Sequence, residues 1–167
     1  MKKIVTLLLA IPIIAFSCKV SYSFKGAVLS DDLKTIEIRD FLIQTAYVYA
    51  PMGQVLNERI KDVFTRNTKL QNITVNPDVE LEGEIVRFDL APIAAQQDGF
   101  AAQTRLTMAV KIRFRNNKDS RKDKEETISA YRDFDSNQML TDVQDQLIDE
   151  LTKEIVDQIF NITMMDW

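Results

Sequence analysis

The chain contains no histidine and only one cysteine, Cys18, and both shortages restrict its chemistry. Histidine is the commonest general base and the commonest metal ligand, so its absence removes the usual zinc and copper sites and the Ser-His and Cys-His nucleophiles. A lone cysteine forms no internal disulfide, so the hydrophobic core alone must hold the fold. We therefore expect a protein without a metal site, without a cofactor and without enzymatic activity.

The sequence also lacks a broad basic character and an apolar run long enough to cross a bilayer. Its net charge is -4 over 167 residues, so the field of the whole protein repels nucleic acid. The apolar run from Ile4 to Phe16 is shorter than the approximately 20 residues that a transmembrane helix needs. We expect neither a nucleic-acid partner nor a membrane-spanning helix.

The first 17 residues have the three-part layout of a secretory signal peptide. Lys2 and Lys3 precede the apolar run, and the small Ser17 stands directly before Cys18. This ending resembles a bacterial lipoprotein signal, in which the cysteine sulfur carries the lipid, although Ala15 stands where the usual signal has Leu. The alternative is a free thiol in an uncleaved helix.

The lipoprotein interpretation divides the chain into three parts. Residues 1–17 are the signal peptide, residues 18–32 a lipidated tether, and residues 33–167 a single domain within a mature chain of 150 residues. Removing Lys2 and Lys3 takes the net charge from -4 to -6. Lys19, rather than Asp, follows the cysteine, which favours outer-membrane sorting and attachment to the inner, periplasmic leaflet.

The first half of the domain alternates between strand and helix patterns. Residues 34–41 have the two-residue period of a half-buried strand, residues 43–50 are ambiguous, and residues 52–67 have a helical period. The apolar residues of 79–90 change parity partway along the strand, which predicts a β-bulge near residues 83–86. A strand covered on both sides is the alternative.

The second half predicts two paired strands and a long helix. Residues 105–115 alternate strictly, residues 116–124 form a charged hairpin connection, and residues 125–134 form the partner strand, with Ile128, Ala130 and Phe134 turned inward. Thr141 and Gln144 resemble a capping box at the start of a helix of about 20 residues. The order β-α-β-β-β-α predicts an α+β fold, a four-stranded, mostly antiparallel sheet with two helices packed on one face.

Four cations lie on the polar face of the strand 105–115, namely Arg105, Lys111, Arg113 and Arg115. Side chains two residues apart on a strand are neighbours, so these cations form a positive stripe suited to phosphate groups. Alternatively, the stripe is an ordinary solvated face whose charges pair with Glu80, Glu82, Glu84 or Glu125.

Three other patterns favour plain structural roles. Residues 133–137 copy the opening of a calcium loop, but Gln138 stands where the loop needs Gly, so we expect a turn that leads into the helix. The alternating Glu80, Glu82 and Glu84 could serve a glycan hydrolase but are typical of a wet strand face. The apolar end 164–167 should fold back on its own domain, or else dock on a partner.

Several strings along the chain together resemble the LPS-assembly lipoprotein family, or LptE family. They are Cys18 with the following S-Y-S-F-K-G-A, then V-E-L-E-G-E-I, R-L-T-M-A-V-K-I-R-F-R-N, Y-R-D-F-D-S and L-I-D-E-L-T-K-E-I-V-D-Q-I-F-N. The resemblance covers nearly the whole mature chain in the same order of elements. None of the strings is a catalytic motif.

The resemblance implies a lipid-anchored periplasmic subunit of the outer-membrane lipopolysaccharide translocon. Such a subunit sits inside and stabilises a large β-barrel partner of the LptD type and helps deliver lipopolysaccharide to the outer leaflet. Two other classes stay open, an envelope lipoprotein that binds another partner through its exposed sheet and a small carboxylate-based glycan hydrolase.

Overall fold

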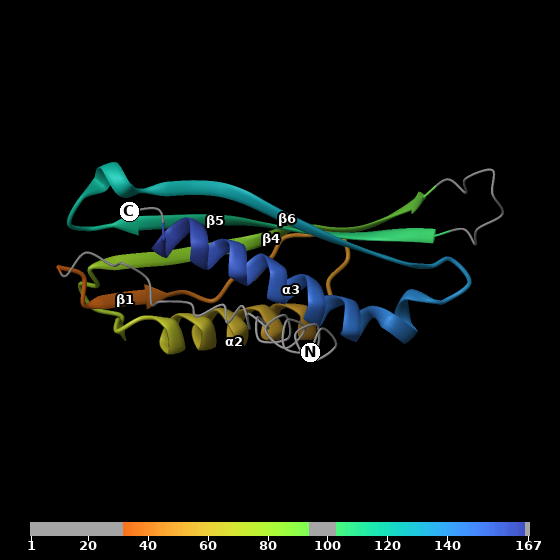
Figure 1. The fold of residues 1–167 in the computed structure, drawn as a ribbon, viewed down its shortest axis with the longest axis horizontal. Helices are drawn as coiled ribbons and strands as arrows, with labels where there is room; N and C mark the ends of the chain where they lie inside the picture. Colours follow the sequence, from red (N-terminus) through yellow and green to blue (C-terminus); the bar gives the residue numbers. More distant parts are fainter. Residues whose placement is uncertain (1–31, 94–102, 166–167) are drawn as a thin grey trace, which may run out of the picture.

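The computed structural model describes residues 32–93 and 103–165. Its elements follow one another as β1 (Thr35–Ile38), β2 (Leu42–Ile43), α2 (Ala50–Asn67), β3 (Gln71–Asn72), β4 (Val79–Ile93), β5 (Gln103–Asn116), the 3₁₀ turn η2 (Ser120–Lys122), β6 (Lys124–Asp135) and α3 (Leu140–Met164). The predicted α+β class is confirmed (Figure 1). Neither described helix is long and apolar enough to cross a membrane.

The sheet has six strands and is mixed, so the prediction of four mostly antiparallel strands is wrong in this detail. Its order is β3-β1-β4-β5-β6, and β2 pairs with β4 beside β1. The long strands β4, β5 and β6 are antiparallel, whereas β1 and β2 run parallel to β4 and β3 runs parallel to β1. The parallel arrangement follows because α2 carries the chain back along the sheet between β2 and β4.

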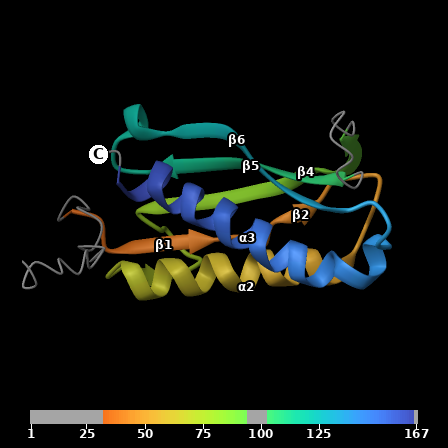
Figure 2. The same ribbon diagram turned by 45° about the vertical axis from the view of Figure 1, so that its right-hand side comes forward.

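Both helices lie against the same face of the sheet, as predicted (Figures 1 and 2). The strict alternation of β5 is the reason, because it turns one continuous apolar row toward them: Leu106, Met108, Val110, Ile112 and Phe114, each at most 1% exposed. From the helices, Leu56, Ile60, Leu151 and Ile155 are completely buried against this layer. The core therefore occupies one side of the sheet only.

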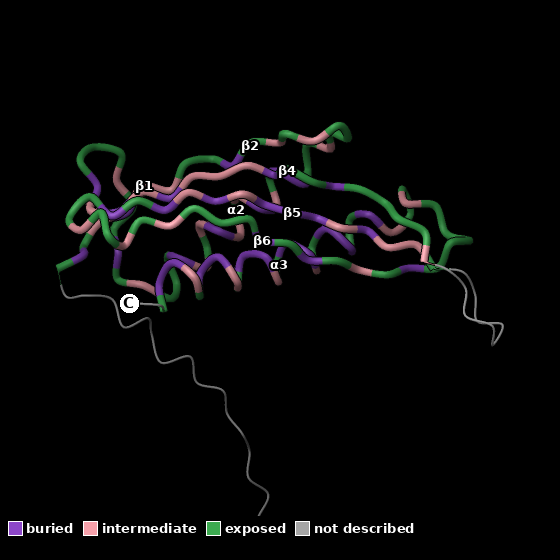
Figure 3. The backbone as a smooth tube through the Cα atoms, turned by 90° about the horizontal axis from the view of Figure 1, so that it is seen from above, coloured by how far each residue is buried: buried purple, intermediate pink, exposed green. Residues whose placement is uncertain are grey.

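The predicted bulge in β4 is confirmed. The pairing of β4 with β5 shifts between Ile85 and Arg87, so Val86 is the extra residue. The shift returns Phe88 to the core side, where it is 6% exposed, whereas Leu90 further along is 46% exposed. Beyond the bulge, β4 is mostly exposed (Figure 3).

A break separates β1 from β2 where the sequence predicted one continuous strand to Phe41. At the break Phe41 turns into the core, and its ring occupies the space beside Gly83, where a Cβ atom would come within 2.4 Å of the ring. Asn57 of α2 holds the broken backbone, because its Oδ1 accepts a hydrogen bond of 2.7 Å from the Phe41 amide and its Nδ2 donates to the Phe41 carbonyl.

The capping box predicted for the last helix is wrong. The helix begins two residues earlier than a cap at Thr141 would place it, so Met139 is the N-cap, and its side chain makes no capping hydrogen bond. Gln144 is buried and instead accepts a hydrogen bond from the Tyr47 hydroxyl at 3.1 Å. The Gln144 side chain is thus engaged in a tertiary contact with Tyr47 rather than in the predicted capping box.

Candidate binding face

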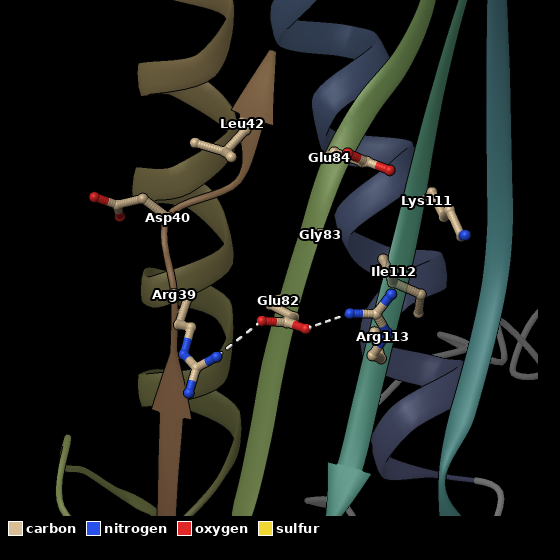
Figure 4. Close-up of a pocket in the computed structure, with 9 residues that line it drawn as sticks. All are labelled: Arg39, Asp40, Leu42, Glu82, Gly83, Glu84, Lys111, Ile112 and Arg113. Carbon is tan, nitrogen blue, oxygen red and sulfur yellow. Dashed lines mark hydrogen bonds and ion pairs between the residues drawn. The ribbon is translucent and has the colours of Figure 1, made fainter. Parts of the chain in front are cut away.

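The side of the sheet opposite the helices carries rows of charged residues, and we call it the open face. Figure 4 shows both helices behind the sheet and the charged side chains of β4 and β5 in front. These side chains occupy the alternate positions that β4 and β5 do not use for the core. The predicted stripe Arg105, Lys111, Arg113 and Arg115 belongs to this face.

Arg105 stands apart from the other three cations, near the start of β5. Its guanidinium donates two hydrogen bonds to Asp133 of β6, at 2.7 and 2.9 Å, and lies 3.8 Å from the centre of the Tyr131 ring. Both partners hold the planar guanidinium in one orientation. The pKa of Asp133 is lowered, because the bonds from Arg105 outweigh the opposing effect of burial.

Lys111 and Arg113 form a connected set of ion pairs with carboxylates of both neighbouring strands. Lys111 lies 2.6 Å from Glu125 of β6, and Arg113 bridges Glu82 at 2.7 Å and Glu125 at 3.5 Å. The cross-strand pairing that the sequence offered as the plain alternative is therefore present for Glu82 and Glu125. Arg115 is exposed and has no ion pair within residues 32–93 and 103–165.

Arg39 joins the same network, although the sequence analysis did not include it in the stripe. It follows β1 and bonds three carboxylates, Glu82 at 2.9 Å, Glu37 at 3.0 Å and Glu80 at 3.1 Å. Its outward parity beside Glu37 is visible in the sequence, but its nearness to β4 is not, because it depends on the parallel pairing of β1 with β4.

A shallow pocket of about 310 Å³ lies in the open face at the break between β1 and β2. Three cations and three carboxylates line it, and Glu82 stands between the guanidinium groups of Arg39 and Arg113 (Figure 4): Arg39, Lys111, Arg113, Asp40, Glu82 and Glu84. The formal charges cancel, so the pocket presents a balanced array of hydrogen-bond donors and acceptors. It can bind a ligand that carries both kinds of group or exchange a carboxylate for another anion.

The surroundings of Glu82 and Glu125 do not favour a role as a general acid. A general acid needs a raised pKa, and burial does act in that direction on Glu82. The hydrogen bonds from Arg113 and Arg39 outweigh burial, so the pKa of Glu82 is lowered. The bond from Lys111 likewise lowers the pKa of Glu125. These carboxylates remain ionised and act as partners for the cations.

The calcium-like stretch 133–137 comprises the end of β6 and a turn that leads into α3, as expected. The Oδ1 atom of Asp135 accepts hydrogen bonds of 2.9 Å from both the amide and the side chain of Asn137, and α3 begins three residues later. Across the described residues there is no group of three or more acidic or cysteine side chains that could hold a metal ion. The apolar end begins inside α3 with a fully buried Met164.

Several predictions concern residues outside the described part of the chain. They are the signal peptide 1–17, the lipid attachment at Cys18, most of the tether 18–32, and Trp167.

Comparison with known proteins finds one matching family model. The model of a family described as lipopolysaccharide-assembly, LptE, matches residues 33–162, which run from just before β1 to two residues before the end of α3. A comparison with curated proteins finds no match.

Solved structures resemble the chain at low identity. The hypothetical protein CT253 from Chlamydia trachomatis is 10% identical with a TM-score of 0.52, over 78% of this chain and 98% of that one. A minor lipoprotein from Acinetobacter baumannii is 18% identical with a TM-score of 0.44, over 79% and 96% of the two chains. Rare lipoprotein B from Shewanella oneidensis is 15% identical with a TM-score of 0.46, over 75% and 91%. At this identity the resemblance to CT253 concerns the fold alone.

Proposed function

The chain belongs to the lipopolysaccharide-assembly family LptE, and from this premise we propose that it is a lipid-anchored periplasmic subunit of an outer-membrane lipopolysaccharide transport complex. In this proposal residues 1–17 are removed, the sulfur of Cys18 carries the lipid, and the domain plugs and stabilises a β-barrel partner of the LptD type. Two or more acyl chains give stable anchoring, as a lipoprotein modification supplies. The work of the protein is assembly and binding rather than catalysis.

The observation that carries this proposal is the open face of the sheet. The family match supports it, because the family is described as one of lipopolysaccharide assembly. One face of the sheet is covered by both helices, whereas the other presents charged side chains near the two ends of β5, Arg105 at one end and Lys111, Arg113 and Arg115 at the other. A strand of 14 residues is about 46 Å long at about 3.3 Å per residue. A rigid surface of this length is long enough for a standard protein interface, which buries about 800 Å² on each partner.

The same face suits a contact with lipopolysaccharide phosphates. A phosphate that approaches the stripe can take the place of the carboxylates that now accept hydrogen bonds from Arg105, Lys111 and Arg113. Arg115, which has no ion pair in the described chain, needs no such exchange. The contact therefore costs least at Arg115, and Arg105 supplies a guanidinium already oriented by Asp133 and Tyr131.

The first experiment is to purify the full-length lipoprotein from outer membranes in mild detergent. We expect a large β-barrel protein to elute with it at equal stoichiometry. The control is the Cys18→Ser variant, which should lose the acyl mass without losing the fold. Elution of the folded, acylated protein without a barrel, or with a different envelope partner, would contradict the translocon role.

The second experiment tests the stripe against a matched control. The triple variant Arg105→Ser, Arg113→Ser and Arg115→Ser should weaken binding to purified lipopolysaccharide. The control variant Arg59→Ser, Lys61→Ser and Lys153→Ser removes the same charge from the two helices on the other side of the sheet. Equal binding by the two folded variants would show that the open face does not contact lipopolysaccharide.

A further inference from the structure

One end of the molecule collects basic residues, although the protein as a whole is acidic. Three segments, 32–35, 66–78 and 116–124, meet there with the end of α3 (Figure 2). The Asp78 carboxylate accepts hydrogen bonds from the Lys34 and Thr35 amides, and Lys118 lies 3.0 Å from Asp78. We call this surface the basic end.

The charges of the basic end sum to a positive value. Its three segments contain seven Lys or Arg and four Asp, a net charge of +3, whereas the mature chain as a whole carries -6. The carboxyl ends of α2 and α3 lie at the same end and offset about one unit of this charge. A charge separation of this kind orients the molecule in front of a charged surface.

Part of this positive charge points into solvent. Lys34, Lys69 and Arg121 are exposed, and the Arg121 side chain is 88% accessible although it pairs with Asp119. Lys124, in contrast, donates a hydrogen bond to the Ile162 carbonyl at the end of α3. These three exposed cations lie on three different segments of this end.

The chain that leads to Cys18 joins the domain at this end. The described residues begin at Asp32, whose carbonyl accepts a hydrogen bond from Lys118. Asp32 is the fourteenth residue after Cys18, so the connecting chain reaches at most about 50 Å when fully extended. A lipid at Cys18 would therefore tether the domain through its basic end.

From the charge and the attachment point together we propose that the basic end docks on the anionic phospholipid headgroups of the leaflet that holds the lipid anchor. Two contacts then set the orientation of the domain. The acyl chains insert into the bilayer, and Lys34, Lys69 and Arg121 face the lipid phosphates. This proposal rests on the proposed lipid anchor for its choice of membrane. The attraction of the basic end to anionic lipid itself needs no anchor.

The test uses the mature chain from residue 18 with Cys18→Ser, so that no acyl chain contributes. Its partitioning is measured by sedimentation with vesicles of phosphatidylglycerol and phosphatidylcholine and with vesicles of phosphatidylcholine alone. Each Lys or Arg at an anionic surface strengthens binding about fivefold, so the variant Lys34→Gln, Lys69→Gln and Arg121→Gln should lose up to about 100-fold in partitioning. The control Arg59→Gln, Lys61→Gln and Lys153→Gln should keep the wild-type value.

Salt supplies a measurement that needs no variant. Wild-type binding to the anionic vesicles should fall steeply as the Debye length shrinks from about 10 Å at 0.1 M to about 3 Å at 1 M ionic strength. Equal partitioning into both kinds of vesicle, or equal loss in the two triple variants, overturns the docking proposal. A full-length protein without acyl mass would instead refute the anchor and leave the lipid attraction to be decided by the same vesicles.

Discussion

Replacing Gly83 by Ala tests how β4 packs at the break between β1 and β2. A Cβ atom at Gly83 would lie 2.4 Å from the Phe41 ring and 2.5 Å from the Lys111 carbonyl oxygen. The carbonyl belongs to the paired backbone of β5, so it cannot move without disturbing the sheet. Overpacking of this kind costs about 1–3 kcal/mol, and we expect Gly83→Ala to lower the free energy of unfolding by about 2–3 kcal/mol.

Urea unfolding measures this loss, and thermal unfolding should show a midpoint lower by about 5–10 °C. Gly53→Ala is the matched control, because its Cβ would meet only the end of the Ile43 side chain, at 3.2 Å, and Ala is favoured over Gly inside a helix by about 1 kcal/mol. A Gly83→Ala protein within about 0.5 kcal/mol of the wild type would refute the placement of Phe41 against β4.

Two further predictions concern the clamp at Asp78 and the start of α3. Hydrogen bonds from the Lys34 amide first, then from Lys118 and Thr35, outweigh burial and lower the pKa of Asp78 from 3.8 to about 2. Asp78→Asn should therefore cost about 2 kcal/mol in urea unfolding at neutral pH, a difference that is fully present above about pH 4 and disappears as the pH falls through about 2. A difference that persists unchanged at the acid end would contradict the assignment. Met139→Asp should stabilise the protein by about 1 kcal/mol, because it supplies the missing cap of α3, and Met139→Ala serves as the control that supplies none.

The elements with strong local patterns were predictable from the sequence. The alternation of β5 fixed which face is buried, and the parity change in β4 located the bulge at Val86. The helices α2 and α3 followed from their apolar periods to within a few residues. In each case the signal lies within the element itself, so no distant contact was needed.

The misses have a common physical cause, because each depends on a contact distant in sequence. The break before Phe41 exists because Gly83 leaves room for the Phe41 ring. The residues next to Phe41 in the sequence carry no pattern that predicts the break. The short strands β2 and β3 contain two residues each and have no period to detect. Gln144 accepts a hydrogen bond from Tyr47, which lies 97 residues away, instead of forming the predicted capping box.

The open face was predictable in its cations and less so in their partners. All four residues of the stripe lie on the open face, and Glu82 and Glu125 pair with it as the sequence allowed. Asp133, the partner of Arg105, was predicted to lie in the neighbouring strand but was not among the carboxylates expected to pair with the stripe. Arg39 was missed as a member, since its place beside Glu82 follows from the parallel pairing of β1.

The position of β1 has a mechanical consequence. A force applied to residue 32 along the sheet pulls β1 lengthwise past β4, because the two strands are parallel and β1 begins at the end where the force enters. Its hydrogen bonds to β3 and β4 then bear the load together, instead of opening one after another as in a peeled hairpin. The Asp78 carboxylate accepts hydrogen bonds from the amides of Lys34 and Thr35 at the start of β1. The first residues to carry the load are therefore also bonded to the residue that directly precedes β4. The force therefore loads β1 in shear. Its rate of detachment under tension is set by the barrier to breaking these hydrogen bonds together.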